Sequence, residues 1–277
     1  MTILEIALCL LSLGLSATSG YYVYWGLGPS FLWIPFLLVP VFYVALLYVW
    51  IFFVFLWGLF FDKKKKVEHF DPFYYSILQS TDRAFVKASR VRWRFFGYQN
   101  VPKEGRFVLV SNHLSNWDQM VLIAALKKKE QPLACITKPE NMNFPIAGPF
   151  IHHSGFIPID REHPEKGREA IEKGVRYLKN GESNICICPE GTRNKTGAPL
   201  LPFHPGSFKL ASWANVPIVV VCLKGTKEIH KRVPFRSARV DIDILETIYP
   251  DKYEKMTSQE LATYCENLIK NDLENQL

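Results

Sequence analysis

The segment FVLVSNHLSNWD, residues 107–118, decides the fold that we expect for this chain. Its first four residues are apolar and rich in valine, a pattern typical of a short buried strand. A polar turn follows, and residues 121–126 then show an apolar helical pattern. A buried strand that passes through a turn into a helix is typical of α/β folds, in which functional sites form at the carboxyl ends of the strands.

The chain after residue 92 alternates between the same two patterns. The predicted strands are residues 133–136, 155–159, 185–188 and 216–223, with an alternating run at 239–244 that predicts an edge strand. The predicted helices are residues 164–178, 208–213 and 259–268. These patterns predict an α/β domain over residues 93–277, with a mixed, largely parallel sheet flanked by helices.

Residues 1–61 are far more apolar than the remainder, and Glu5 is their only formally charged side chain. Residues 3–17 and 40–61 are apolar runs, and the second suits a spanning helix, which needs about 20 residues. Glycines, a proline and aromatic residues predict a turn at 19–30. We expect an apolar N-terminal membrane hairpin that either crosses the bilayer or lies in one leaflet. A hairpin buried in a soluble protein is the alternative, but so long an apolar run rarely finds enough core to cover it.

Residues 62–92 join this membrane-attachment segment to the α/β domain. They begin with four consecutive lysines, residues 63–66. Basic residues beside a span stay on the cytoplasmic side and attract anionic lipid, so we expect the domain on the cytoplasmic face of the membrane. Residues 70–91 mix aromatic and polar residues near helical spacing, which predicts an amphipathic linker helix against either the bilayer or the domain.

The distribution of charge narrows the classes of partner. The whole chain carries a net charge of +7, and all 33 lysines and arginines lie beyond residue 61. A basic body suits an anionic bilayer, a phosphorylated substrate or nucleic acid, but no zinc-finger spacing or helix-turn-helix pattern supports nucleic acid. The cysteines lack paired Cys-x-x-Cys spacing, so we expect reduced structural thiols and no metal site. They are Cys9, Cys135, Cys186, Cys188, Cys222 and Cys265.

His113 and Asp118 follow the strand at 107–110 and are candidate catalytic residues. If a helix starts near Ser115, Asp118 lies in its first turn and the preceding turn can fold His113 back toward the carboxylate. Such a carboxylate holds one ring nitrogen and makes the other a better base, which suits removal of a proton from a hydroxyl. A structural alternative exists, because Ser115-x-x-Asp118 also resembles a helix capping box.

Three further fragments lie in or just after strand-like runs. They are Lys138-Pro-Glu with a later Pro-x-x-Gly, GFIPIDR at residues 155–161, and PEGTR at residues 189–193. Lys138, Arg161 and Arg193 offer donors to an anionic group, and arginine can bind phosphate through two parallel hydrogen bonds. Gly191 allows a ligand to approach the backbone closely. Taken singly, each arginine is more often a solvated surface charge than a ligand group.

These four blocks, in this order, resemble the 1-acylglycerol-3-phosphate acyltransferase family, also called lysophosphatidic acid acyltransferases. The blocks are Asn-His-x-x-x-x-Asp at 112–118, Lys-x-Glu with Pro-x-x-Gly at 138–148, the glycine-to-arginine block at 155–161, and Pro-Glu-Gly-Thr-Arg at 189–193. Pro217 within an apolar strand and the segment FHPGSFK at 203–209 extend the similarity. The resemblance covers roughly residues 97–223. Cys188 and His204 depart from the usual aromatic and basic residues.

The resemblance implies a role for each matching residue. His113 would be the general base and Asp118 its partner. The residues implied to bind substrate, most of them around the phosphate, are Lys138, Gly155, Arg161, Glu190, Gly191, Thr192 and Arg193. The resemblance therefore implies an enzyme with two catalytic residues beside a phosphate pocket.

The resemblance also implies a reaction. A fatty acyl group would pass from acyl-CoA or acyl carrier protein to 1-acylglycerol 3-phosphate, a lysophosphatidic acid, giving phosphatidic acid for phospholipid biosynthesis. We expect direct transfer without a covalent acyl-enzyme, and no Gly-x-Ser-x-Gly nucleophile motif is present. The chemistry requires no cofactor or metal. Acylation of glycerol 3-phosphate or another lysophospholipid stays open, as does a non-catalytic lipid-binding protein. A transporter is excluded, because only the leader is apolar enough for the membrane.

Overall fold

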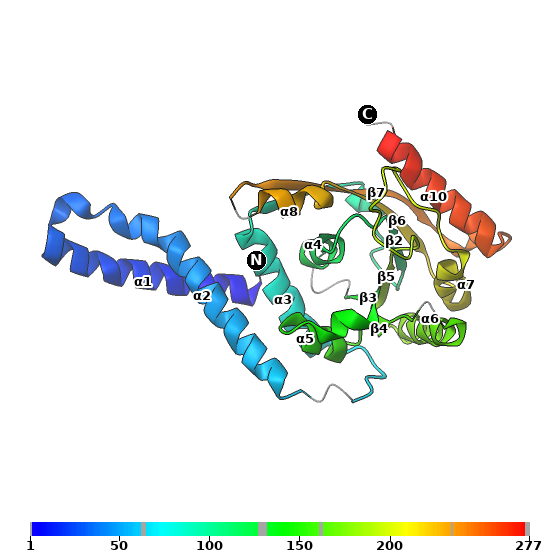
Figure 1. The fold of residues 1–277 in the computed structure, drawn as a ribbon, viewed down its shortest axis with the longest axis horizontal. Coiled ribbons are helices and arrows are strands. Elements are labelled where there is room, and N and C mark those ends of the chain that lie inside the picture. The colour runs from blue at the N-terminus through cyan, green and yellow to red at the C-terminus, as the bar shows by residue number, and fades with distance from the viewer. Residues whose placement is uncertain (1, 62–64, 127–131, 161–162, 234, 275–277) are drawn as a thin grey trace.

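The computed structural model describes residues 2–61, 65–126, 132–160, 163–233 and 235–274. Helices α1 (Ile3–Leu27) and α2 (Ile34–Leu59) form a hairpin that projects from an α/β domain (Figure 1). Both helices are long and apolar enough to cross a membrane, judged by length and composition. Most of their large apolar side chains are exposed. The apolar hairpin predicted from the sequence is confirmed.

The turn of the hairpin is shorter than predicted. Helix α1 continues through most of residues 19–30 and ends at Gly28, whose φ of +91° is open to glycine at little cost. Helix α2 starts at Ile34 with Pro35 in its first turn, and it includes Pro40. Pro40 was predicted to begin the helix. It lies inside the helix instead, where its missing N–H removes one backbone hydrogen bond.

Helix α3 (Pro72–Ala88) supports the base of the hairpin. The Glu5 carboxylate accepts the N–H of Thr2 and pairs with Lys87, and Arg83 Nε lies 3.6 Å from it. The apolar contact between hairpin and α3 is made by Leu8, Leu47 and Ala84. The hairpin is therefore joined to the domain by one compensated charge surrounded by apolar packing.

The domain is built on a seven-stranded sheet in the order β1-β7-β6-β2-β5-β3-β4. The β6–β7 pair is antiparallel and the other pairs are parallel, so the predicted sheet type is confirmed. The strands are β1 (Val91–Phe96), β2 (Val108–Ser111), β3 (Leu133–Thr137), β4 (Ile157–Pro158), β5 (Asn184–Ile187), β6 (Ile218–Lys224) and β7 (Ala238–Ile248).

Two strands differ from the sequence prediction. Strand β1 was not predicted, because alternating arginines interrupt its aromatic residues. Strand β7 was predicted at an edge, but it lies between β1 and β6. Its polar positions are accommodated by partners on both neighbours, since Asp241 pairs with Arg94 of β1 and Asp243 pairs with Lys224 of β6. The alternating polar residues of β7 therefore reflect ion pairs with its two neighbouring strands, and they do not mark an edge strand.

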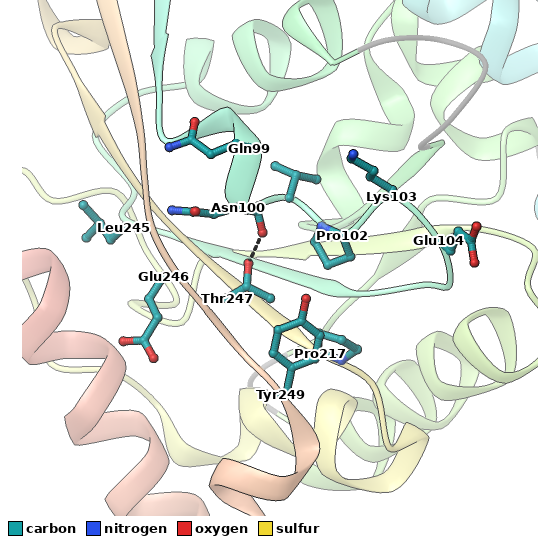
Figure 2. A pocket seen from close by; sticks show the side chains of 11 residues that line it. Gln99, Asn100, Pro102, Lys103, Glu104, Pro217, Leu245, Glu246, Thr247 and Tyr249 are labelled. Carbon is teal, nitrogen blue, oxygen red and sulfur yellow. Dashed lines mark hydrogen bonds between the residues drawn. The ribbon is translucent and has the colours of Figure 1, made fainter.

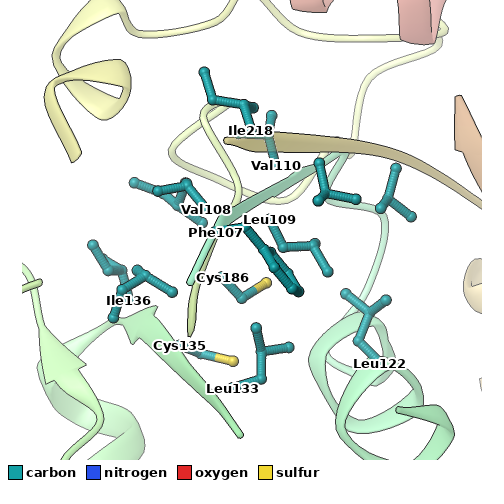
Figure 3. Close-up of a cluster of buried hydrophobic side chains, with 14 of the residues drawn as sticks. Phe107, Val108, Leu109, Val110, Leu122, Leu133, Cys135, Ile136, Cys186 and Ile218 are labelled. Carbon is teal, nitrogen blue, oxygen red and sulfur yellow. The ribbon is translucent and has the colours of Figure 1, made fainter. Parts of the chain in front are cut away.

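Helices cover both faces of the sheet. Helices α3, α4 (Trp117–Ala125) and α5 (Ala147–His153) lie on one side, and α6 (Pro164–Lys179), α7 (Lys209–Ala214) and α10 (Ser258–Glu274) lie on the other (Figure 1). Short helices α8 (Ile229–Arg232) and α9 (Pro250–Tyr253) precede and follow β7. Phe107, Leu122 and Leu133 are almost fully buried in the hydrophobic core around β2 (Figure 3).

Lys224 should be essential to the stability of this domain. Its Nζ lies 2.7 Å from Asp243 Oδ2 and 2.6 Å from Asp272 Oδ2, which connects β6 to β7 and α10. Burial opposes the charged form, but the two carboxylates raise the pKa of Lys224 above its ordinary value. Lys224→Met would leave two carboxylates facing each other, so we expect the free energy of unfolding to fall by about 2 kcal/mol.

Chemical unfolding of the purified protein would measure this effect. The control is Lys231→Met, which removes an exposed pair with Glu228 and should change the free energy of unfolding by less than about 0.5 kcal/mol. Equal effects of the two substitutions would contradict the assignment.

Candidate active site

The candidate site starts where β2 ends. The Asn112 side chain is fully buried; its amide donates to the Leu223 carbonyl at 2.9 Å and its oxygen accepts the Leu223 N–H at 2.7 Å. This side chain continues the pairing of β2 with β6 for one more residue. The direction of the backbone at His113, just past the carboxyl end of β2, is therefore fixed.

His113 and Asp118 meet in the turn between β2 and α4. Their Nδ1 and Oδ2 atoms are 2.8 Å apart, and the Asp118 side chain is completely buried. The same Oδ2 accepts the N–H groups of Leu114 at 2.7 Å and Ser115 at 2.9 Å. A carboxylate accepts hydrogen bonds, so we infer that Nδ1 carries the proton and that Nε2 has a free lone pair. The His113 side chain is 19% exposed, which leaves that nitrogen within reach of a substrate.

The spacing of five residues therefore predicted the contact correctly. The alternative, a capping interaction by Asp118, also describes the structure, because Asp118 accepts the Ser115 N–H. The two interpretations are compatible, since one carboxylate holds both the turn and the ring. The catalytic role of the pair remains a prediction.

A second loop, residues 189–194, lies directly against His113. Glu190 Oε1 accepts the His113 N–H at 2.5 Å, and Oε2 accepts the Leu201 N–H at 3.0 Å. The Asn194 N–H donates to the His113 carbonyl at 2.8 Å. Burial raises the pKa of Glu190, and the two N–H donors oppose that rise. Gly191 has a φ of +72°, which suits glycine at the tight turn of this loop.

The other predicted substrate residues are placed less uniformly. Lys138 is exposed just after β3, Thr192 is exposed, and Arg193 is half-buried in the loop beside His113. Gly155 is buried, and a Cβ there would lie 2.8 Å from the His69 carbonyl oxygen, so its surroundings are protein packing. Arg161 lies outside the described residues. The structure thus brings the loop at 189–194 to His113, while binding of substrate by these residues stays a prediction.

A cavity of about 580 Å³ opens next to this loop. Pro189 and Gly191 form one wall, at the carboxyl end of β5. The remaining lining combines isoleucines and basic side chains with one acidic side chain, and it includes Ile136, Ile159, Ile171, Ile187, Arg168, His204, Lys209 and Asp160. Sequence reasoning did not find Arg168 or Ile171. The two residues lie three positions apart on the predicted helix and therefore share one face, which is the sequence pattern that could have indicated them.

A larger hollow of about 780 Å³ lies at the opposite edge of the sheet, at the amino ends of β2 and β6 (Figure 2). Polar contacts cross it, such as the Thr247 hydroxyl donating to the Asn100 carbonyl. Neither cavity is lined by His113 or Asp118 themselves, but Pro189 and Gly191 of the smaller one flank Glu190, which accepts the His113 N–H, so we place the candidate site at the smaller cavity.

Cys188 is a potential nucleophile close to the end of β2. Its thiol is buried beside Ser111, with 3.5 Å between Sγ and Oγ. Burial raises the pKa of the Cys188 thiol well above its ordinary value, so it is poorly suited to attack a thioester. Among the described residues, no three of His, Cys, Asp and Glu gather in a group that could hold a metal ion.

Known proteins are similar to this chain in sequence. Residues 92–224, which contain all four motif blocks, match the model of the Acyltransferase family. The 1-acyl-sn-glycerol-3-phosphate acyltransferase of Salmonella typhimurium is 28% identical over 169 residues, covering 61% of this chain and 67% of that protein. The alpha form from Bos taurus is 30% identical over 157 residues, covering 56% of this chain and 53% of that protein.

A solved structure extends the comparison to the fold. The 1-acyl-sn-glycerophosphate acyltransferase PlsC of Thermotoga maritima has a TM-score of 0.58 and 23% sequence identity, and the match covers 84% of this chain and 95% of that one. The α/β domain therefore has the fold of this acyltransferase. The family match and the named relatives agree with the motif blocks, so the resemblance to 1-acylglycerol-3-phosphate acyltransferases that was predicted from the sequence is confirmed.

The geometry predicts that His113 and Asp118 act together. His113→Ala removes the base, and Asp118→Asn removes the charge that stabilises the protonated ring, so each should lower kcat by about 10²–10⁴. Steady-state acyl transfer, with folding checked by thermal unfolding, would measure this. Cys188→Ala is the control and should keep near-parental turnover. A folded His113→Ala protein with full activity would contradict the base assignment, and an inactive Cys188→Ala protein would indicate a covalent route.

Proposed function

We propose that this chain transfers a fatty acyl group from a thioester to the free hydroxyl of 1-acylglycerol 3-phosphate, which gives phosphatidic acid. The observation that carries the proposal is the His113–Asp118 pair, with Nε2 free beside the Pro-Glu-Gly-Thr-Arg loop. The named activity of the relatives supports the same acceptor.

The proposed chemistry needs only the chain's own residues and the two substrates. His113 Nε2 removes the proton from the acceptor hydroxyl, and the oxygen attacks the thioester carbonyl. Asp118 stabilises the imidazolium through its hydrogen bond to Nδ1, and two backbone N–H groups hold its carboxylate in place. As the tetrahedral intermediate collapses, the sulfur leaves and the proton on His113 passes to it, which gives the free thiol and the new ester.

We propose that the phosphate of the acceptor binds beside the loop at 189–194. Arg193 and Lys138 supply cationic donors there, with Arg161, Gly191 and Thr192 from the same motif blocks. The neighbouring cavity supports this placement, since Arg168 and Lys209 lie among its isoleucines. Such a lining suits an acceptor that carries both an anionic group and an apolar chain.

Acyl-CoA and acyl carrier protein are both proposed as donors. Each presents its acyl group as a thioester on a pantetheine arm, so the attack by the acceptor is the same. The basic character of the chain, whose net charge is +7, suits either anionic carrier.

A product assay with several acceptors and both donors tests the proposal. We expect 1-acylglycerol 3-phosphate to have the highest kcat/KM. An acceptor without the phosphate should lose about 10–100-fold for each charge-assisted hydrogen bond that it cannot form. Glycerol 3-phosphate and a lysophospholipid with a blocked phosphate complete the panel, and the His113→Ala protein gives the background. Preference for glycerol 3-phosphate would change the acceptor, and binding of lysolipid without turnover would indicate a non-catalytic protein.

We further propose that the hairpin crosses the bilayer and holds the domain on the cytoplasmic face. The start of α1 and the end of α2 both lie against the domain, beside α3 and α5 (Figure 1). The turn lies at the far end, and Tyr22, Trp25 and Trp33 near it are exposed, as in the aromatic belt of a membrane interface. Lys65 and Lys66 are exposed at the domain end, and Lys63 and Lys64 lie outside the described residues.

Labelling of single introduced cysteines would test this topology in intact cells. Ser30→Cys, in the turn, should react with a membrane-impermeant maleimide added outside, because a hairpin of 25- and 26-residue helices is long enough to reach the far surface. Ser237→Cys, an exposed position on the domain, should react only after permeabilisation. Protection of both positions would indicate a hairpin in one leaflet, and labelling of Ser237→Cys alone would indicate the reversed orientation.

A further inference from the structure

Glu190 is the most deeply buried acidic group beside His113 other than Asp118. It is 3% exposed, and both of its carboxylate oxygens are engaged by backbone N–H groups, those of His113 and Leu201. A carboxylate whose two oxygens both accept backbone N–H groups repels an anionic phosphate. The geometry therefore does not suit the substrate-binding role that the family resemblance implies for Glu190.

The contacts of Glu190 fall on the backbone of the catalytic residue itself. His113 lies between the end of β2 at Ser111 and the start of α4 at Trp117, where neither a strand ladder nor a helix supplies its hydrogen bonds. The loop at 189–194 supplies them. The Glu190 side chain takes the His113 N–H, and the Asn194 N–H binds the His113 carbonyl at 2.8 Å.

Hydrogen bonds of the loop's own residues hold its conformation, so the loop can support the backbone of His113. The Asn194 side chain accepts the Thr196 N–H at 3.1 Å and donates to the Ala198 carbonyl at 2.8 Å. Glu190 closes the same loop through Leu201, eleven residues further along the chain. On the other side of His113, the Asn112 side chain is bound by β6. The backbone of the base is thus held between two rigid elements.

We propose that Glu190 is a positioning residue for His113. Its carboxylate fixes the backbone of the base, so that the ring held by Asp118 presents Nε2 to the acceptor hydroxyl. The inference rests on the proposed role of His113 as the base. A displacement of about 1 Å at a reacting group can cost about 10²-fold in rate, which is the effect that the carboxylate prevents.

Glu190→Gln in the full-length chain is the principal test. Glutamine keeps the size of the side chain, but its NH₂ group would face an N–H donor, so one of the two hydrogen bonds is lost. We expect kcat to fall about 10–100-fold while the acceptor KM stays within about threefold. Hydrogen exchange of a peptide covering residues 112–118 should become faster. Arg193→Ala, in the proposed phosphate pocket, should instead raise the acceptor KM.

Glu182→Gln is the matched control. Glu182 precedes β5 at its amino end, whereas Glu190 follows β5 at its carboxyl end, and Glu182 also accepts a backbone N–H, that of Phe70 at 3.0 Å. We expect its substitution to leave kcat and the exchange of residues 112–118 unchanged. Glu190→Asp is a second variant, because it keeps the charge but is too short to reach both N–H groups. It should show a reduced kcat as well.

The outcomes separate the positioning role from the alternatives. A raised acceptor KM with normal kcat in Glu190→Gln would overturn the inference in favour of substrate contact. Full activity in Glu190→Asp would mean that charge alone matters, and unchanged hydrogen exchange would mean that the carboxylate does not hold His113. Activity of a folded His113→Ala protein would refute the proposed chemistry, whereas the exchange measurement would still decide whether Glu190 holds this backbone.

Discussion

Compensation of the buried Asp118 charge is the constraint on which the site depends. A carboxylate without solvent is costly unless hydrogen bonds replace the lost water. Here one oxygen receives the Leu114 and Ser115 N–H groups and the His113 ring. Those donors converge only if the chain between β2 and α4 follows this turn. The requirement to satisfy one charge therefore sets both the path of the backbone and the orientation of the ring.

The same principle governs the attachment of the hairpin. Glu5, the only formal charge in the first 61 residues, is 2% exposed and meets Lys87 and Arg83 of α3. Helix α3 in turn bonds to the sheet side of the domain, where the Tyr75 hydroxyl accepts the Leu133 N–H and Gln79 donates to the Ile123 carbonyl. One helix thus connects the membrane segment to the elements that carry the site.

Parallel pairing explains why segments far apart in the chain share one site. Strands β2, β3 and β5 are parallel neighbours, so their carboxyl ends lie at the same edge. The residues that follow them, His113, Lys138 and Glu190, are brought to this edge although more than 70 positions separate the first from the last. A sheet of this kind can gather a base, cationic side chains and a positioning loop without long excursions of the chain.

The sequence by itself determined the local features of this protein. It predicted the apolar hairpin, most strands and helices, and the His113–Asp118 contact, because periodicity, turn residues and short spacings act within a few residues. Only the tertiary structure decided the place of β7 inside the sheet, the existence of β1, the packing around Gly155 and the partners of Glu190. Each of these features depends on which segment, distant in the sequence, packs against it in the folded chain. Pairing of β1 with β7 joins residues about 150 positions apart, and the Glu190 carboxylate reaches His113 across 77 positions, so no local pattern could indicate either contact.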